Sequence, residues 1–176
     1  MSAARKPGTP ARPARKLSHF DDAGHVRMVD VSAKPATERT AVAGAFVRMR
    51  SSTVATLRQV KNPKGDPLEV ARIAGILAAK RTSELIPLCH PLMLTHVDVR
   101  VVLCQNGMEI TSEVTTTGPT GVEMEALVAA SVAALTIYDM CKSVERGITI
   151  TDLHLLEKKG GRSGHYLRSE PGRKQR

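Results

Sequence analysis

Residues 97–114 read VDVRVVLCQNGMEITSEV, and this stretch predicts a β-hairpin. The dipeptide Asn106-Gly107 in its middle is typical of a tight turn between antiparallel strands. On both sides of the turn, apolar residues recur with the two-residue period of a strand; they are Val97, Val99 and Val101 before it and Met108, Ile110 and Val114 after it. The chain therefore contains at least one antiparallel strand pair.

One further strand is expected on each side of this hairpin in the sequence. Residues 39–50, RTAVAGAFVRMR, alternate in a way that predicts a strand buried on both faces, although a helix is the competing interpretation. Residues 148–159, ITITDLHLLEKK, predict a last strand that runs into the glycine-rich loop GGRSG at 160–164. The predicted sheet thus has four strands.

Three helices are expected between these strands. Ser51 and Ser52 favour a short helix through residue 60, followed by a loop over 62–65. Asp66 before Pro67 predicts a helix to about residue 81, and its apolar residues nearly encircle it, so cover on more than one side is expected. Thr120 and Glu123 have the spacing of a capping box, which predicts a long helix from 120 to about 144.

The order of these elements predicts an α+β fold with the ferredoxin-like β-α-β-β-α-β arrangement, an antiparallel sheet with helices packed on one face. We expect a single domain over residues 17–166, flanked by disordered basic tails at 1–16 and 167–176. Aromatic residues make up only 2% of the chain, so the core has to be built from aliphatic residues and alanine. The fold does not by itself decide the function.

The net charge of +9 is concentrated at the two ends of the chain. Residues 1–16 carry five basic and no acidic side chains, and 157–176 carry seven basic and two acidic ones, which leaves the middle close to neutral. A neutral middle is not typical of a nucleic-acid-binding face, so no nucleic-acid partner is expected. Nor is a membrane partner expected, because we find no apolar run of 18 residues.

The three cysteines fit neither a disulfide framework nor a C-x-x-C motif. We therefore expect a reducing compartment, the cytoplasm, and no metal site. The start of the chain lacks the apolar region of a secretory signal; a transit peptide shares its basic, acid-free composition and is the alternative to a disordered tail.

Asp139 and Lys142 stand three residues apart on the predicted long helix, where they share a face. An exposed ion pair is the simplest interpretation of that spacing. The apolar neighbours Ile137 and Met140 favour a second one, in which a partly desolvated pair with shifted pKa values exchanges protons with a substrate.

Other candidate residues lie in predicted loops and at the start of the same helix. His90, between two prolines in PLCHP (87–91), is either an acid or phosphate donor or a loop histidine with a backbone partner. Glu125 could accept hydrogen bonds from a guanine-like edge, and an exposed helical glutamate explains it equally well. Lys64 does not belong to an ATP-binding Walker loop, because the required glycine spacing is absent.

Four stretches together resemble one enzyme family. They are HVRMVDVSAK (25–34), ARIAGILAAKRTSELIPLCHPL (71–92), TGVEMEALVAASVAALTIYDMCK (120–142) and LLEKKGGRSGHY (155–166). The chain resembles cyclic pyranopterin monophosphate synthase, accessory protein C of molybdenum cofactor biosynthesis, over about residues 17–166. The resemblance implies a cytoplasmic lyase that converts (8S)-3′,8-cyclo-7,8-dihydroguanosine 5′-triphosphate to cyclic pyranopterin monophosphate and diphosphate, with no redox cofactor.

The resemblance also implies roles for individual residues. It makes Asp139 the principal acid/base, Lys142 its partner and Lys64 a further catalytic or phosphate-binding lysine. It assigns substrate binding to two segments and two basic positions, namely Leu88, Cys89 and His90, Met124 and Glu125, and Arg39 and Lys158. It further implies a homohexamer, a trimer of dimers, with sites at the dimer interface.

Alanines at 126, 129, 130, 133 and 134 would make the long helix smooth enough for such an interface, or for an ordinary core. Two other functions remain in view. One is an RNA-binding module, which would lack stacking aromatics because Phe46 is the only aromatic residue in a predicted strand. The other is an inactive family member that acts as a partner protein.

Overall fold

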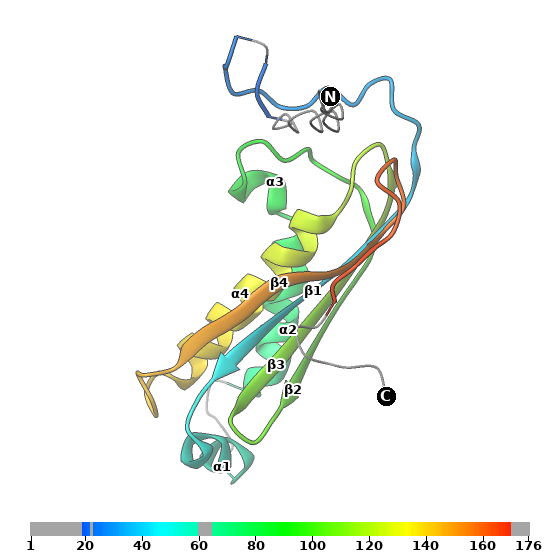
Figure 1. Cartoon of the computed structure of the whole chain (residues 1–176). Helices are drawn as coiled ribbons and strands as arrows, with labels where there is room; N and C mark the ends of the chain where they lie inside the picture. The colour runs from blue at the N-terminus through cyan, green and yellow to red at the C-terminus, as the bar shows by residue number, and fades with distance from the viewer. Residues whose placement is uncertain (1–18, 22, 60–64, 170–176) are drawn as a thin grey trace, which may run out of the picture.

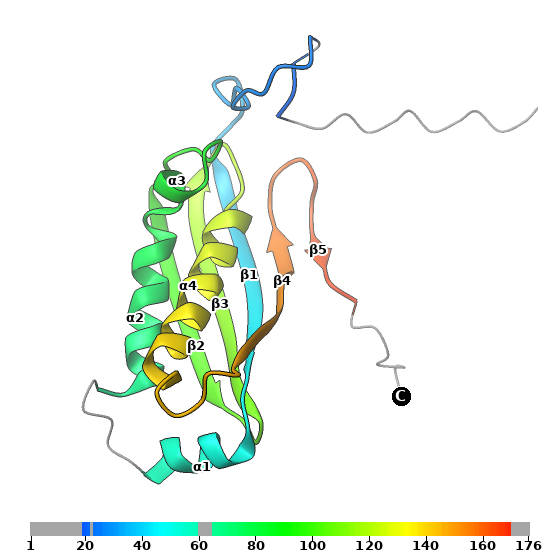
Figure 2. The ribbon, with the colours of Figure 1, turned by 90° about the vertical axis from the view of Figure 1, so that its left-hand side faces the viewer.

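The computed structural model describes residues 19–21, 23–59 and 65–169. The described elements form one antiparallel sheet with its long helices on one face, as Figures 1 and 2 show. In chain order they are β1 (Thr37–Arg48), α1 (Ser51–Gln59), α2 (Pro67–Ala79), α3 (Thr82–Leu85), β2 (Leu94–Leu103), β3 (Gly107–Gly118), α4 (Glu123–Cys141), β4 (Thr149–Lys159) and β5 (Tyr166–Leu167).

The strand order β2-β3-β1-β4-β5 confirms the predicted ferredoxin-like arrangement. β1 lies in the middle and pairs antiparallel with β3 on one side and β4 on the other. The predicted hairpin is confirmed as β2 and β3, whose turn is closed by a 2.8 Å hydrogen bond from the Cys104 N–H to the Gly107 carbonyl. β5 was not predicted, because two residues are too few for a periodic signal.

β1 is a strand, as predicted, but it is only partly buried on its second face. Ala41, Ala43, Ala45 and Val47 are buried beneath the helices, while Val42 and Phe46 on the other face are half-buried. Within the described chain, no helix covers that second face (Figure 2). Gly44, between Val42 and Phe46 on the same face, is buried, so the prediction of burial on both faces is confirmed for the helix face and only in part for the other.

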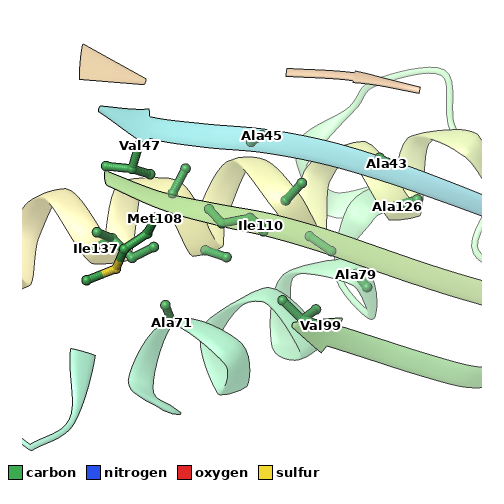
Figure 3. Close-up of a cluster of buried hydrophobic side chains, with 14 of the residues drawn as sticks. Ala43, Ala45, Val47, Ala71, Ala79, Val99, Met108, Ile110, Ala126 and Ile137 are labelled. Carbon is green, nitrogen blue, oxygen red and sulfur yellow. The ribbon is translucent and has the colours of Figure 1, made fainter. Parts of the chain in front are cut away.

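The core lies between the sheet and the pair α2 and α4, and it is built from aliphatic residues and alanine as the composition predicted. Figure 3 shows side chains from α2, α4, β1, β2 and β3 meeting in this layer. All five alanines of α4 considered above are fully buried inside the chain. They therefore serve the core, and α4 approaches α2 so closely that a Cβ on Gly75 would lie 2.9 Å from the Ala129 carbonyl oxygen.

The start of α4 differs from the prediction. The helix begins at Glu123, its N-cap is Val122, and no side chain makes a capping hydrogen bond, so the predicted Thr120–Glu123 capping box is wrong. The Glu123 carboxylate instead pairs with Lys158 of β4, with Nζ and Oε1 3.3 Å apart. Glu123 therefore pairs with a lysine of β4 and not with the backbone N–H of Thr120, as a capping box would require.

The helix predicted from Asp66-Pro67 to about residue 81 is confirmed as α2, and the short helix α3 after it was not predicted. α2 stops at Ala79, and the short α3 follows, with the Thr82 hydroxyl donating to the Ala79 carbonyl at 3.0 Å. The segment PLCHP is a loop, as predicted. The first part of this loop is a turn, closed by a 3.1 Å hydrogen bond from the Cys89 N–H to the Ile86 carbonyl.

α4 is also the one helix in the described ranges that is long and apolar enough to cross a membrane by composition. In this fold 56% of its apolar window is buried inside the chain, which is how a central core helix satisfies the same test. At the C-terminal side, the Arg168 N–H donates to the Leu156 carbonyl at 2.8 Å and so continues the sheet edge. The predicted tail at 1–16 lies outside the described residues, as does 170–176 of the other.

Candidate functional site

Several loops gather at the end of the molecule where α4 begins. Figure 2 shows that the segment before β1, the loop after α3 and the hairpin between β4 and β5 all lie at this end. Two pockets lie there side by side. They share Lys34, Thr120, Gly121 and Glu123 in their walls, so they form one continuous depression.

The larger of the two, which we call the basic pocket, has a volume of about 590 Å³. It is defined by the cationic side chains Lys34, Arg39, Lys158, Lys159 and Arg162 around the loops 119–122 and 160–163. The acidic residues Glu38 and Glu123 also line it. Basic side chains therefore outnumber acidic ones, which suits a ligand with several negative charges.

Arg39 is held in place by the backbone around it. Its Nε donates to the Gly118 carbonyl at 3.0 Å, which fixes the guanidinium at the end of β3. The same guanidinium lies over Gly161, where a Cβ would overlap Nη1. Gly161 also has a φ of 72°, a left-handed conformation that favours glycine. The GGRSG loop thus has a glycine where Arg39 needs the space.

Lys158 is bound to two neighbours inside the basic pocket. Its ammonium group donates to the Ser163 hydroxyl and pairs with the Glu123 carboxylate. Only 21% of the Lys158 side chain and 33% of the Glu123 side chain are exposed. This ion pair is therefore partly shielded from solvent, unlike the pair between Lys159 and Glu157, whose lysine is largely exposed.

The smaller pocket, which we call the Glu125 pocket, has a volume of about 280 Å³. It contains the predicted substrate-binding segments together, with Leu88, Cys89 and His90 on one side and Met124 and Glu125 on the other. Glu125 is only 4% exposed. Burial raises the pKa of its carboxyl to about 7 and the negative charge of Glu123 adds to this, while a hydrogen bond from its own N–H opposes the rise. Near neutral pH, Glu125 is therefore available both as a hydrogen-bond acceptor and, when protonated, as a donor.

His90 and Cys89 have surroundings that limit their chemistry. His90 Nε2 lies 2.8 Å from the Val29 carbonyl oxygen, so this nitrogen donates to the segment before β1. The predicted backbone partner of a loop histidine is thus present, and the ring still lines the Glu125 pocket. Burial, and next the Glu125 charge, raise the pKa of the Cys89 thiol, which disfavours a nucleophilic thiolate.

Asp139 and Lys142 lie at the opposite end of α4. Their Oδ1 and Nζ atoms are 2.7 Å apart, and the side chains are 58% and 52% exposed. The predicted desolvation is therefore not found within the chain, and the hydrogen bond that Lys142 donates to the Asp139 carboxylate raises the pKa of Lys142 rather than lowering it. Asp139 lies sixteen positions after Glu123, a rise of about 24 Å along the helix. One chain does not bring this pair to the pockets.

Lys64 lies outside the described residues. The described residues that follow it, Gly65 and Asp66, lead into α2, where Asp66 Oδ1 accepts from the Leu68 N–H at 2.9 Å as predicted for an N-cap. Figure 2 shows that α2 begins at the end of the molecule where α4 finishes. No group of three His, Cys, Asp or Glu side chains that could hold a metal ion occurs in the described part of the chain.

Sequence reasoning missed two features of this site. Lys34 lines both pockets, although it was noticed only as part of the motif at 25–34. The pairing of Glu123 with Lys158 was hidden because the local spacing to Thr120 offered a simpler explanation for Glu123. A contact between residues so far apart in sequence leaves no local pattern.

Comparison with known proteins gives a consistent result. A model of the MoaC family matches residues 28–161. The chain is also 58% identical over 156 residues to the cyclic pyranopterin monophosphate synthase of Heliobacterium modesticaldum (strain ATCC 51547 / Ice1), covering 88% of this chain and 98% of that relative. The range matched by the family model includes every wall residue of the basic pocket except Arg162 and Ser163, and it includes the pair Asp139 and Lys142.

Proposed function

Because this chain belongs to the MoaC family and is an enzyme of molybdenum cofactor biosynthesis, we propose that it is a cyclic pyranopterin monophosphate synthase. The proposed substrate is (8S)-3′,8-cyclo-7,8-dihydroguanosine 5′-triphosphate, and the proposed products are cyclic pyranopterin monophosphate and diphosphate. One observation carries the proposal, namely the opening of the basic pocket into the Glu125 pocket through shared walls. A molecule with a purine-derived ring and a triphosphate needs both kinds of surroundings.

In this proposal the triphosphate binds in the basic pocket. Arg39 and Lys158 provide planar and point-like cationic groups for phosphate oxygens, and both are oriented by neighbouring backbone or side chains. Positive charge there also stabilises the negative charge that develops on departing diphosphate. The nearby Lys34, Lys159 and Arg162 extend the same field along the phosphate chain.

The ring system would then bind in the Glu125 pocket. An ionised Glu125 accepts two hydrogen bonds, which matches the amino group and ring N–H of a guanine-like edge. Leu88 and Met124 provide apolar walls, and Cys89 and His90 complete the pocket. Because Glu125 is nearly inaccessible to water, a hydrogen bond lost at this position is costly, which favours selectivity for that edge.

We propose that a second copy of the chain supplies Asp139 and Lys142. The pair is about 24 Å along α4 from the pockets of its own chain, as estimated above from the helical rise. Ile73 and Leu77 on α2 remain exposed, so apolar surface is left for contacts between copies. This arrangement agrees with the expected hexamer, a trimer of dimers with sites at the dimer interface.

Within that interface, Asp139 would act as the acid/base and Lys142 as its partner. The 2.7 Å contact between them already allows a proton to pass from one group to the other. Contact with a second chain would also remove water from the pair, which lowers the pKa of a lysine. Lys64 is proposed as an additional cation for the phosphates or the transferred proton. The free thiols of Cys89, Cys104 and Cys141 suit the proposed cytoplasmic location.

The direct test is incubation of the purified protein with the cyclised dihydro-GTP substrate. We expect stoichiometric release of diphosphate and formation of a pterin monophosphate. A coupled phosphate assay measures the diphosphate, and mass spectrometry identifies the pterin. GTP itself serves as the control, because it lacks the 3′,8 bond and should release no diphosphate. Absence of product at micromolar enzyme would refute the proposed reaction.

The two-chain site is tested by mixing inactive variants. Asp139→Asn and Glu125→Gln chains, each nearly inactive alone, are co-expressed with different affinity tags, and mixed oligomers are isolated through both tags. Mixed oligomers should regain a substantial part of the wild-type rate, because some of their sites receive both intact residues. Mixed oligomers that stay as inactive as the separate variants would show that one chain contributes all groups of its own site.

A further inference from the structure

Glu123 stands at the boundary between the two pockets, and the proposed reaction gives it no role. It lines both of them and holds the Lys158 ammonium group at 3.3 Å. A carboxylate is unfavourable next to a bound triphosphate, because two anions would then share one cationic site. Its presence among five basic side chains therefore requires an explanation.

The backbone next to Glu123 is shaped to receive its carboxylate. Gly121 lies directly beneath it, and a Cβ at that position would overlap Oε2 and would also lie 2.7 Å from Cδ. Gly121 is not one of the glycines with a positive φ, so conformation alone does not require glycine there. The missing side chain instead lets the Glu123 carboxylate turn back toward Lys158.

We propose that Glu123 is an internal counter-ion that competes with phosphate oxygens for Lys158 and thereby sets how tightly the basic pocket holds polyphosphate. This inference rests on the proposed binding of the triphosphate in that pocket. When phosphate contacts Lys158, the carboxylate gives way, and when diphosphate leaves, the carboxylate returns. The ion pair thus keeps the cationic pocket from retaining its own product.

The partial burial of the pair makes this competition measurable. With 21% and 33% of the two side chains exposed, their attraction is screened less than that of a fully exposed pair. The other acidic wall residue, Glu38, makes no ion pair with any residue in the described ranges, so it provides a matched control for the loss of one negative charge.

The test measures binding of inorganic triphosphate and inorganic diphosphate to the full-length protein by calorimetry at low salt. Glu123→Gln should bind both anions more tightly than the wild type, by about 3- to 10-fold, and the difference should shrink in ~0.5 M salt. Glu38→Gln should change affinity by less than about twofold, because it removes charge without releasing Lys158. With the true substrate, Glu123→Gln should lower KM and also lower kcat, as slower diphosphate release requires.

A second variant tests the position of the Glu123 carboxylate without removing its charge. Gly121→Ala keeps the carboxylate but forces its flexible end away from the backbone, so Lys158 should again be released and the anions should bind more tightly. In the double variant Glu123→Gln with Lys158→Gln, the gain should disappear, because the two changes act on one contact.

Unchanged or weaker anion binding by Glu123→Gln would overturn the inference, and so would failure of the wild type and this variant to bind inorganic triphosphate at all. These measurements need no turnover. A protein that binds the anions as described but makes no pterin product would leave the counter-ion role intact and refute the proposed reaction. If the protein makes the product but Glu123→Gln binds the anions no more tightly than the wild type, the proposed reaction stands and the counter-ion role is refuted.

Discussion

Glu125 and Glu145 are both nearly buried carboxylates, yet their surroundings shift their pKa values in opposite directions. Glu125 has mainly burial around it, which raises its pKa to about 7. Glu145 is 7% exposed and accepts from the Thr53 hydroxyl at 2.7 Å and the Arg50 N–H at 3.0 Å, and these donors lower its pKa. The difference between the two sites is the number of donors. Glu145 therefore stabilises contacts within the fold, whereas Glu125 keeps acceptor capacity for the substrate proposed above.

The raised pKa of Glu125 has a consequence for stability. The folded protein holds this proton up to about pH 7, whereas the unfolded chain releases it near 4.5, the ordinary value. Stability from the neutral form is therefore complete below pH 4.5 and is lost as pH rises through 7. Relative to Glu125→Gln, the wild type should lose roughly 1–3 kcal/mol of unfolding free energy between pH 4.5 and 8.

Chemical denaturation at several pH values measures this difference. Glu84→Gln, which removes an exposed glutamate of α3, is the control and should run parallel to the wild type. A constant gap between the wild type and Glu125→Gln across this range would contradict the assigned burial effect.

Asp139→Asn should separate catalysis from stability. The side chain is largely exposed, and asparagine keeps its shape, so Tm should stay close to that of the wild type. Diphosphate release should fall by about 100-fold or more, because asparagine cannot transfer the proton. Scanning calorimetry and the coupled phosphate assay measure the two effects, and near-normal turnover would remove Asp139 from the proposed mechanism.

At the scale of elements, Glu145 connects the start of α1 with the segment after α4. Its carboxylate reaches the Arg50 guanidinium at 3.3 Å in addition to its two shorter hydrogen bonds. Glu145→Gln should lower Tm by several degrees at pH 7. Because the pKa of Glu145 is lowered in the fold, its contribution is present above the ordinary value of 4.5 and is lost below it. The Tm difference should therefore shrink in acid, and a difference that grows there would contradict the assigned contacts.

The contact between α2 and α4 gives a second prediction at this scale. Alanine at position 75 would favour the helix, yet its Cβ would lie 2.9 Å from the Ala129 carbonyl oxygen and 3.2 Å from a Val99 methyl group. Because the nearest atom belongs to backbone, the two helices would have to move apart. Gly75→Ala should cost about 1–3 kcal/mol in denaturant unfolding, as over-packed cores do. A stabilised variant would show that the helices are less tightly packed than described.

The elements with regular periods were predictable, and those that depend on distant contacts were not. The alternating valines and Asn106-Gly107 predicted β2, β3 and their turn, and Asp66-Pro67 predicted the start of α2. The capping box failed because a charged partner on β4 competes for Glu123. The short helix α3 was also missed, since its four residues give little periodic signal and the sequence alone does not reveal the Thr82 hydrogen bonds to the end of α2.

At the scale of the whole molecule, the sequence placed its candidate residues in one site, and the described chain divides them between two ends. The residues of the Glu125 pocket lie together, as do Arg39 and Lys158 in the basic pocket. Asp139 and Lys142 lie apart from both, and Lys64 lies outside the described residues. A site at a dimer interface, which the resemblance implies, would divide the residues of one chain in this way. The motifs did not reveal which of the residues lie at which end of the chain, because sequence similarity does not show which copy supplies a residue.

A truncation addresses the N-terminal residues. The family match begins at residue 28, and the described contacts with the pockets begin at His19. A chain that lacks residues 1–16 should therefore assemble and turn over substrate at a rate within about twofold of the full-length protein. Size-exclusion chromatography and the phosphate assay test this, and a large loss of rate would assign these residues a part in function.

α4 runs from Glu123 to Cys141 without a glycine or proline, so its two ends are joined by a stiff rod. In the proposed assembly, the length of α4 sets the distance between the pockets at one end and Asp139 at the other. If two chains each contribute one end of α4 to a shared site, both sites depend on that length. One additional helical turn would increase the distance between the two ends by about 5.4 Å. Natural variation in this enzyme should therefore tolerate new residues in surface loops and avoid changing the number of residues between Glu123 and Asp139.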